Sequence, residues 1–304
     1  MAVLSQRLRQ EARDLVELVL LPGLAAVLPW SWCFRFFQKL ARWHWLYRGT
    51  SDRALEQAAQ RGWVTDAPSW AAARRLVTLV DHADYYLAVT RSDRWLRRHM
   101  RVDGHWPAQG HAAVLCTFHW GAGMWGLRHA AVSGLSGHPL VAPLQKIQFS
   151  GRSVLYWYAR KRTACVGRMV GQPTLDVSAS LRPVLRALRA GEQVMAAVDV
   201  PADQVSASTT VPLLNLHARV PTALLRVAVE QQVPVVVYVT GVNLRTGKRF
   251  LRLRTMHATH DVDVMAQQVF VQLGEFIAQD PAAWHFWSES ERFFVAPPDA
   301  HGGG

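Results

Sequence analysis

At 304 residues the chain is long enough to bury one substantial core and too short to favour two full-sized enzyme domains. Its formal charge is +12, half of its residues are hydrophobic and 13 are Trp, which together favour an anionic and apolar partner such as a membrane surface. The three cysteines form no CxxC or zinc spacing, and an odd number argues against a disulfide framework, so reduced thiols on the cytosolic side are expected.

The N-terminal segment, residues 1–50, is predicted to be helical and to associate with a membrane. Residues 18–34 carry no charge and arginines flank them on both sides, but acidic residues before them exclude a cleavable secretory signal. The length is borderline for a span, and Pro22, Gly23 and Pro29 are expected to break a straight helix. An anchor lying in the interface is therefore favoured over a membrane span and over a buried helical hairpin. The residues expected at headgroup level are Trp30, Trp32, Trp43 and Trp45.

Residues 51–296 predict an α/β domain. Two helices come first, with Ser51 and Asp52 expected to cap residues 53–61 and Ser69 expected to cap a helix that ends near residue 89. Short apolar runs typical of buried strands follow at 112–118, 138–144, 193–200, 234–242 and 249–256. Helical segments alternate with them at 123–133, 150–161, 177–189, 221–231 and 264–279. This alternation predicts a largely parallel central sheet flanked by helices, followed by a disordered tail over residues 297–304.

His119 is the first candidate for catalysis. It follows the predicted strand 112–118 directly and precedes a glycine turn, and active sites of parallel sheets lie at the carboxyl ends of strands. Between Asp103 and Asp176 there is no acidic residue, whereas seven Lys or Arg and five His lie there. A strand-end His inside such a basic stretch indicates a cleft for phosphate-bearing substrates, with a solvated basic surface as the alternative.

A dinucleotide site is a competing interpretation of the same loop. Gly121, Gly123 and Gly126 satisfy GxGxxG between a predicted strand and a predicted helix. No Asp or Glu follows the next strand to bind a ribose, and the motif lies far from the N-terminus. This function is therefore the less favoured one.

At His119 the sequence resembles the late acyltransferases of bacterial lipid A synthesis, whose hallmark is a strand, a His, a glycine and an acid five positions after the His. The resemblance continues in order and spacing over nearly the whole chain. It includes an Arg-bearing helix at 150–162, a Leu-x-x-Gly stretch that leads to a strand ending in Asp at 188–199, and the C-terminal residues Pro281, Trp284, Arg292 and Phe293.

The resemblance implies a glycerolipid acyltransferase-like fold and a set of residue roles. His119 would be the general base that takes a proton from an acceptor hydroxyl, and Asp199 matches a functional Asp of the family. Either Arg160 or Arg162 would contact a phosphate or the carrier protein. From their residue type, Gly121 and Gly123 would let the backbone turn closely so that its amides face an anion or oxyanion, with a plain tight turn as the alternative. No metal or cofactor is implied.

The family's acidic position is occupied here by Met124. An imidazole base needs a carboxylate that orients it and stabilises its charged form. Three alternatives follow: Asp199 supports His119 from the neighbouring strand end; the acceptor, such as a neutral amine, needs less base assistance; or acyl transfer is lost and the fold binds lipid.

The function expected from the resemblance is transfer of an acyl chain from an acyl carrier protein, or a similar thioester donor, to a lipid or glycolipid acceptor. Its place would be the cytoplasmic face of the inner membrane, with the protein bound peripherally or monotopically. A catalytically silent lipid-binding protein is the alternative. Nucleic acid is not an expected partner, because no RNP-like or helix-turn-helix segment is found.

Overall fold

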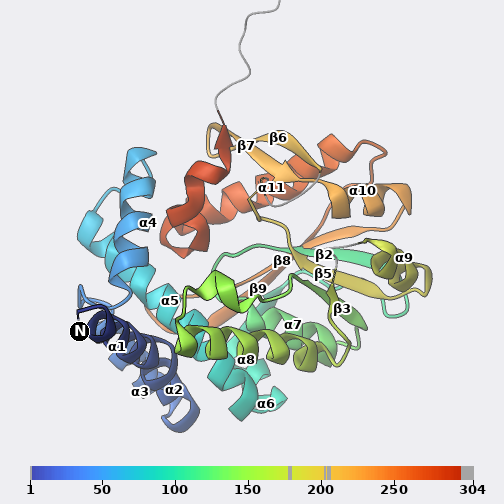
Figure 1. Cartoon of the computed structure of the whole chain (residues 1–304). Helices are drawn as coiled ribbons and strands as arrows, with labels where there is room; N and C mark the ends of the chain where they lie inside the picture. Colours follow the sequence, from blue (N-terminus) through green and yellow to red (C-terminus); the bar gives the residue numbers. More distant parts are fainter. Residues whose placement is uncertain (1, 177–179, 202, 204–206, 296–304) are drawn as a thin grey trace, which may run out of the picture.

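The computed structural model describes residues 2–176, 180–201, 203 and 207–295 (Figure 1). Its helices are α1 (Ala2–Asp14), η1 (Leu15–Leu20), α2 (Leu21–Val27), α3 (Trp30–Leu40), α4 (Arg48–Gln60), α5 (Ala67–Thr90), α6 (Asp93–His99), α7 (Met124–Val132), η2 (Lys146–Phe149), α8 (Ser153–Val170), α9 (Arg182–Arg189), α10 (Ala223–Glu230), α11 (Val262–Gln279), η4 (Pro281–Ala283) and η5 (His285–Arg292). Its strands are β1 (Met100–Asp103), β2 (Ala113–Thr117), β3 (Gly137–Val141), β4 (Leu175–Asp176), β5 (Gln193–Ala197), β6 (Ser208–Leu213), β7 (Leu216–Pro221), β8 (Val235–Val242), β9 (Arg249–Thr255) and β10 (Phe294–Val295).

The central sheet is mostly parallel, as the sequence predicts. Its seven strands follow the order β1-β9-β8-β2-β5-β3-β4, in which only β8 and β9 pair antiparallel. A second, antiparallel sheet has the order β10-β7-β6. In Figure 1, α10 and α11 lie above the central sheet and α7 and α8 lie below it. The fold is therefore an α/β sandwich.

Both faces of the sheet are buried. On β2, Val114 and Cys116 belong to a core with α10 and α11, whereas Ala113 and Leu115 belong to a second core with α3, α5 and α7. Successive side chains of a strand point to opposite faces, so a strand covered on both sides must be apolar at every position. This explains the continuous apolar runs that identified the strands in the sequence.

All five predicted strands of the central sheet are present, but β1, β4 and the smaller sheet were not anticipated. The β6–β7 turn has positive φ at both Leu214 and Asn215, a backbone conformation for which Leu gives no sequence signal. The helix predicted for residues 177–189 starts only at Arg182, after β4, and residues 177–179 lie outside the described part of the chain, as does the predicted tail.

Two helix caps were predicted wrongly. α4 starts at Arg48, so Ser51 lies inside the helix and is buried, and the expected boundary at residue 50 falls within α4. The N-cap of α5 is Asp66, whose carboxylate accepts a hydrogen bond from the Ser69 amide at 3.0 Å. Asp is as good an N-cap as Ser, and Pro68 in the first turn marks the same start.

The N-terminal segment is helical, but Pro22 does not interrupt it as predicted. A π-helical turn, η1, precedes Pro22, and hydroxyl groups from elsewhere in the chain bond the carbonyls that this geometry leaves free. Tyr86 Oη donates to the Leu18 carbonyl and Tyr47 Oη to the Glu17 carbonyl, each at 2.7 Å. The chain breaks instead at Pro29, between α2 and α3.

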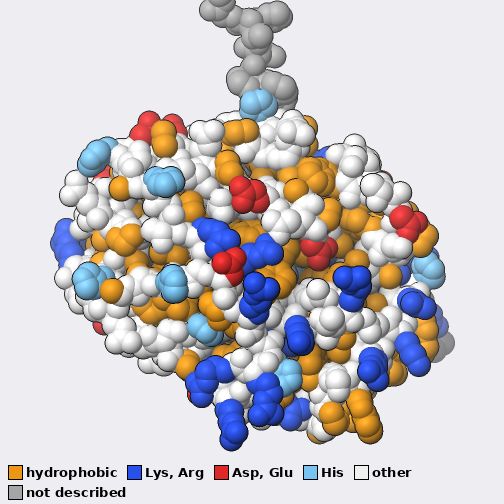
Figure 2. Space-filling model, turned by 180° about the vertical axis from the view of Figure 1, so that it is seen from behind, with side chains coloured by type: hydrophobic (Ala, Val, Ile, Leu, Met, Phe, Trp, Pro, Cys, Tyr) orange, Lys and Arg blue, Asp and Glu red, His pale blue; other side chains and the backbone are white. Residues whose placement is uncertain are grey.

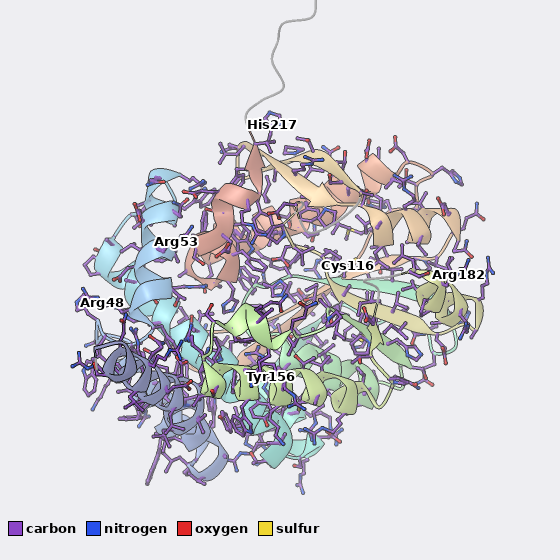
Figure 3. All side chains as sticks on the ribbon, in the orientation of Figure 1. Arg48, Arg53, Cys116, Tyr156, Arg182 and His217 are labelled. Atoms are coloured by element: carbon purple, nitrogen blue, oxygen red, sulfur yellow. The ribbon has the colours of Figure 1, made fainter. Side chains whose placement is uncertain are left out.

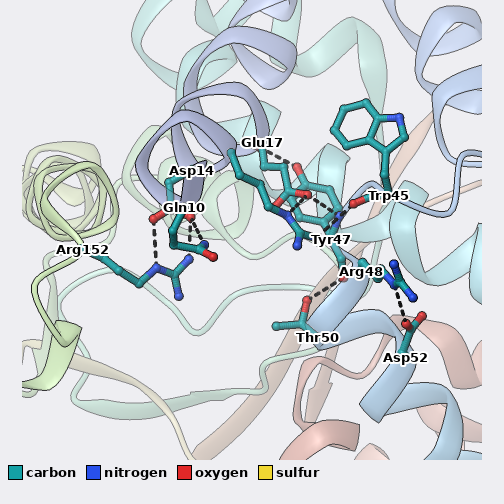
Figure 4. Close-up of polar contacts among 10 residues, drawn as sticks. Gln10, Asp14, Glu17, Trp45, Tyr47, Arg48, Thr50, Asp52 and Arg152 are labelled. Carbon is teal, nitrogen blue, oxygen red and sulfur yellow. Dashed lines mark hydrogen bonds and ion pairs between the residues drawn. The ribbon is translucent and has the colours of Figure 1, made fainter. Parts of the chain in front are cut away.

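The acidic side chains of this segment form hydrogen bonds and ion pairs with other parts of the protein (Figure 4). The Asp14 carboxylate accepts from Arg152 Nε at 2.9 Å, and Glu17 accepts from the Tyr47 amide at 2.6 Å. Glu11 accepts from the amides of Ser153 and Val154 and so caps the start of α8. The acidic residues that interrupt a basic N-terminus therefore fasten it to α8 and to the residues before α4.

The outer surface of the N-terminal segment exposes three of the four expected tryptophans. Trp32, Trp43 and Trp45 are 68%, 53% and 43% exposed. Trp30 is buried, and its Nε1 donates to the Gly247 carbonyl at 2.9 Å, so its expected place at headgroup level is wrong. Within the described residues, none of the helices combines the length and the apolar character that crossing a membrane requires.

Candidate active site

His119 and Asp199 meet because their strands are neighbours in register. Thr117 pairs with Ala197 at the carboxyl ends of the parallel strands β2 and β5, and the Val198 amide extends the contact to the Thr117 carbonyl at 2.9 Å. The two candidate residues each lie two positions beyond that pair. Parallel register therefore places the carboxylate beside the imidazole.

The Asp199 carboxylate holds both the ring and the backbone of His119. Oδ1 is 2.9 Å from His119 Nδ1, and the His119 amide donates to Oδ1 and Oδ2 at 2.8 and 2.9 Å. Asp199 is fully buried, whereas the His119 side chain is 42% exposed. A carboxylate on Nδ1 fixes the tautomer in which Nδ1 carries the proton, so Nε2 is the basic nitrogen offered to a substrate.

Two opposing effects set the pKa of His119. Burial lowers it and is the largest single effect, but the charge of Asp199 and its hydrogen bond raise it. Together with the nearby Asp81 these contributions prevail, so the pKa of His119 lies above its ordinary value of 6.5. A general base with a pKa near neutrality or slightly above it suits proton transfer under physiological conditions.

The C-terminal strap, residues 281–287, closes over the loop that carries His119. The Gly121 amide donates to the Ala283 carbonyl at 3.0 Å, and the His285 amide donates to the His119 carbonyl at 2.7 Å. His285 Nε2 lies 2.7 Å from the Gly121 carbonyl oxygen. Trp284 Nε1 donates to Asp199 Oδ2 at 3.0 Å. The strap therefore contacts both members of the His119–Asp199 pair.

A second polar group lies at the junction of α5 and α8. Arg162 Nη2 is 2.7 Å from Asp81 Oδ1, and His82 Nδ1 is 2.9 Å from the hydroxyl of Tyr158. Burial and the charge of Arg162 lower the pKa of His82 to about 3, which keeps it neutral. The charges of Arg162 and Asp81 both act on the pKa of His119, so this group lies within electrostatic reach of the imidazole.

Arg160, the other arginine candidate, points elsewhere. Its guanidinium lies 5.7 Å from the centre of the Tyr156 ring (labelled in Figure 3), on α8. Arg160, Tyr156, Lys161 and Arg168 line a groove of about 1080 Å³ between α8 and residues 141–144. Residues two apart on a helix face different directions. The charge of Arg162, and not that of Arg160, is among the main influences on the pKa of His119.

The glycines of the GxGxxG pattern have distinct surroundings. Gly121 has a φ of +71°, and a Cβ there would lie 2.3 Å from the Thr240 carbonyl oxygen. A Cβ on Gly126 would collide with the ring of Tyr238 at 2.9 Å, whereas one on Gly123 would meet open space. Close packing against β8 therefore requires two of these glycines. The Gly121 amide already bonds Ala283 and is not offered to an anion.

Met124 starts α7 and is buried. It packs in an apolar cluster with Leu18, Tyr85, Tyr158 and Cys165. A carboxylate in this position would have to enter that cluster, where burial of a charge is costly. The carboxylate in contact with His119 is that of Asp199, and residue 124 contributes an apolar side chain.

Comparison with known proteins adds evidence for the class of chemistry. Residues 149–289 match the family model of the bacterial lipid A biosynthesis acyltransferases. The matched, acyltransferase-like segment contains Arg162, Asp199 and Trp284, and His119 precedes it. A search of curated proteins finds no match to the chain. The similarity supports a lipid acyltransferase activity in general.

The sequence did not identify Asp81, His82, Tyr158 or His285 as parts of the site. Asp81 and His82 lie in the middle of an apolar helix, and adjacent titratable residues there were the only available signal. They lie far from His119 in sequence, so no local pattern links them to it. Trp284 was noted for its resemblance to the family pattern, without its bond to Asp199.

Proposed function

We propose that the protein transfers an acyl chain from an acyl carrier thioester to a hydroxyl of a lipid or glycolipid acceptor, with His119 as general base. The observation that carries this proposal is the contact between His119 Nδ1 and the buried Asp199 carboxylate, on an imidazole that stays partly exposed. The partial match to lipid A biosynthesis acyltransferases supports the same class of reaction.

These residues suit the following reaction steps. His119 Nε2 takes the proton of the acceptor hydroxyl while its oxygen attacks the thioester carbonyl carbon, and Asp199 stabilises the imidazolium that forms. The tetrahedral oxyanion collapses, the carbon–sulfur bond breaks, and the departing thiolate takes the proton from His119. An ester and a free carrier thiol result.

Arg162 is the side chain proposed to face the acceptor's phosphate. It is partly exposed and already holds Asp81, so it offers further N–H donors to an anion without leaving its position. Arg160 and Lys161 would instead serve the carrier protein, since the basic groove that they line suits an acidic partner.

We propose that the outer side of the N-terminal helices binds the lipid surface. α3 exposes Trp32, Arg35, Phe36 and Lys39 on one side and buries Cys33, Phe34 and Phe37 on the other. Figure 2, the view from behind, shows Lys and Arg side chains over the lower half and the right side of the molecule, with hydrophobic side chains at the lower right. Aromatic rings interleaved with cations suit anionic lipid headgroups at the inner membrane.

The test is acyl transfer by the purified protein in detergent or vesicles, from acyl carrier thioester to a bacterial lipid extract, with products read by mass spectrometry. The variants His119→Ala and Asp199→Ala are each expected to lose at least roughly a hundredfold in rate. The exposed His260→Ala serves as the matched control and should behave as wild type.

Two results would contradict the proposal. Product formation that persists in His119→Ala would exclude His119 as the base. Absence of product from the wild-type protein, with lipid binding retained in vesicle co-sedimentation, would favour the silent lipid-binding function instead.

A further inference from the structure

We propose that Trp284 is a positioning residue for the His119–Asp199 pair: its indole N–H holds the second oxygen of the carboxylate and shares its negative charge. This inference rests on the proposed function for its catalytic meaning. The predicted effect of Trp284 on the pKa of His119 does not depend on any substrate and can be measured without one.

The Asp199 carboxylate accepts hydrogen bonds from two parts of the chain, the loop after β2 and the strap. His119 donates from its amide and from Nδ1, and Trp284 Nε1 donates to Oδ2 at 3.0 Å. Both Asp199 and Trp284 are fully buried. Because the carboxylate is enclosed, the indole N–H acts in a low-dielectric environment, where a hydrogen bond to a charged group is strong.

The Trp284 ring is itself held firmly. It packs edge to face on Trp287 and Phe293, with ring centres 5.1 and 5.4 Å apart. The guanidinium of Arg74, buried in α5, donates to the Trp284 carbonyl at 2.8 Å and to the His285 carbonyl at 3.1 Å. The strap is therefore anchored from α5, and its tryptophan keeps a fixed direction towards Asp199.

The direction of the effect follows from electrostatics. A donor on Oδ2 disperses the charge of the carboxylate and weakens its attraction for the imidazolium of His119. Removing that donor concentrates the charge on the pair, which stabilises protonated His119. Loss of the indole N–H should therefore raise the pKa of His119 and move the rise of the rate–pH profile to higher pH.

The experiment compares wild type, Trp284→Phe and Trp106→Phe in the full chain. The His119 pKa is measured by NMR titration of protein labelled at histidine ring carbons, with the His119 signal assigned by its loss in His119→Gln. Trp284→Phe should raise this pKa by about half a unit or more, the equivalent of one net hydrogen bond. Trp106→Phe is the matched control, because its indole donates to His129 Nδ1 and not to Asp199.

The kinetic readout is the midpoint of kcat/KM against pH, which should move upward together with the titration. If Trp284→Phe lowers stability, replacement of Trp284 by benzothienylalanine keeps the shape of the ring and removes only the N–H donor, so the same shift is expected. An unchanged or lowered His119 pKa in the folded variant would overturn the assignment. Lack of acyl transfer beside a raised pKa would instead count against the proposed function alone.

Discussion

At the scale of single residues, one buried carboxylate determines both the position and the basicity of His119. Asp199 bonds the amide and Nδ1 of the same residue, so the imidazole cannot rotate without losing a charge-assisted hydrogen bond. Since Met124 is apolar and buried, we infer that Asp199 takes the role of the acid that the resemblance places at residue 124.

The pH dependence of acyl transfer should follow the titration of His119. The base must be neutral, and the pKa of His119 is raised above 6.5, so kcat/KM should increase with pH through a midpoint above 6.5. In Asp199→Asn the effect of burial, which lowers the pKa, stays while the charge of the carboxylate is gone. The midpoint should therefore fall below that of wild type, with a loss of roughly a hundredfold or more in kcat/KM. Coincident profiles would contradict the pairing.

Met124→Glu tests whether restoring an acid in the family position helps. The new carboxylate would enter an apolar cluster around Tyr85 and Tyr158, so the free energy of unfolding should fall by about 2 kcal/mol or more without a gain in acyl transfer. Urea unfolding and the acyl transfer assay provide the two measurements, and Met124→Leu is the conservative control. Higher activity at unchanged stability would show that residue 124 faces His119.

At the scale of elements, a buried ion pair joins α5 to β9. Asp84 and Arg249 are both fully buried and bonded to each other, and the guanidinium lies 4.3 Å from the centre of the Trp30 ring. Burial raises the pKa of Asp84 to about 6, against the opposing charge of Arg249. The pair connects the N-terminal helices with the helix that carries Asp81 and Arg74.

Breaking this pair should be far more costly than breaking an exposed one. Arg249→Met leaves an uncompensated carboxylate in the core and should lower the free energy of unfolding by about 3–5 kcal/mol, whereas adding Asp84→Leu should recover most of the loss. Arg254→Met is the control, because its ion pair with Asp103 is exposed and should contribute less than about 1 kcal/mol. Equal losses in urea unfolding would show that burial of the pair has no special effect.

At the scale of the whole molecule, the charges are segregated around the N-terminal helices. Their acidic residues bind inward to α8 and Tyr47, while Arg7, Arg9, Arg35 and three of the four tryptophans remain on the outside. The same segment also contributes Phe34, Phe37 and Leu40 to the core below the sheet. A lipid surface bound here would therefore hold the catalytic unit directly, without an intervening linker.

Binding to vesicles of anionic phospholipid should depend on the exposed tryptophans. The triple change Trp32→Ala, Trp43→Ala and Trp45→Ala removes three large apolar side chains from the outer surface and should weaken co-sedimentation at least roughly tenfold. Val264→Ser with Val271→Ser, on the exposed side of the distant helix α11, is the control and should have no effect. Unchanged binding of the triple variant would place the lipid surface elsewhere.

The sequence by itself determined the class of the fold and the position of the candidate base. Strands covered on both faces must be apolar at every position, so β2, β5 and β8 were predictable, and a His directly after β2 had to lie at the edge where sites of parallel sheets form. The α5 and α11 helices were likewise predictable from their long apolar patterns. The local periodicity of apolar residues indicates which side chains are buried, and all of these elements have buried faces.

Only the tertiary structure decided which side chains meet His119. Asp199 is adjacent because β5 lies beside β2, and Trp284 because the strap folds back over the loop. Asp81 and Arg162 come from helices that cross near the site, and Trp30 turned inward to Arg249. Such contacts join residues far apart in sequence, and their energies depend on packing that no local pattern records.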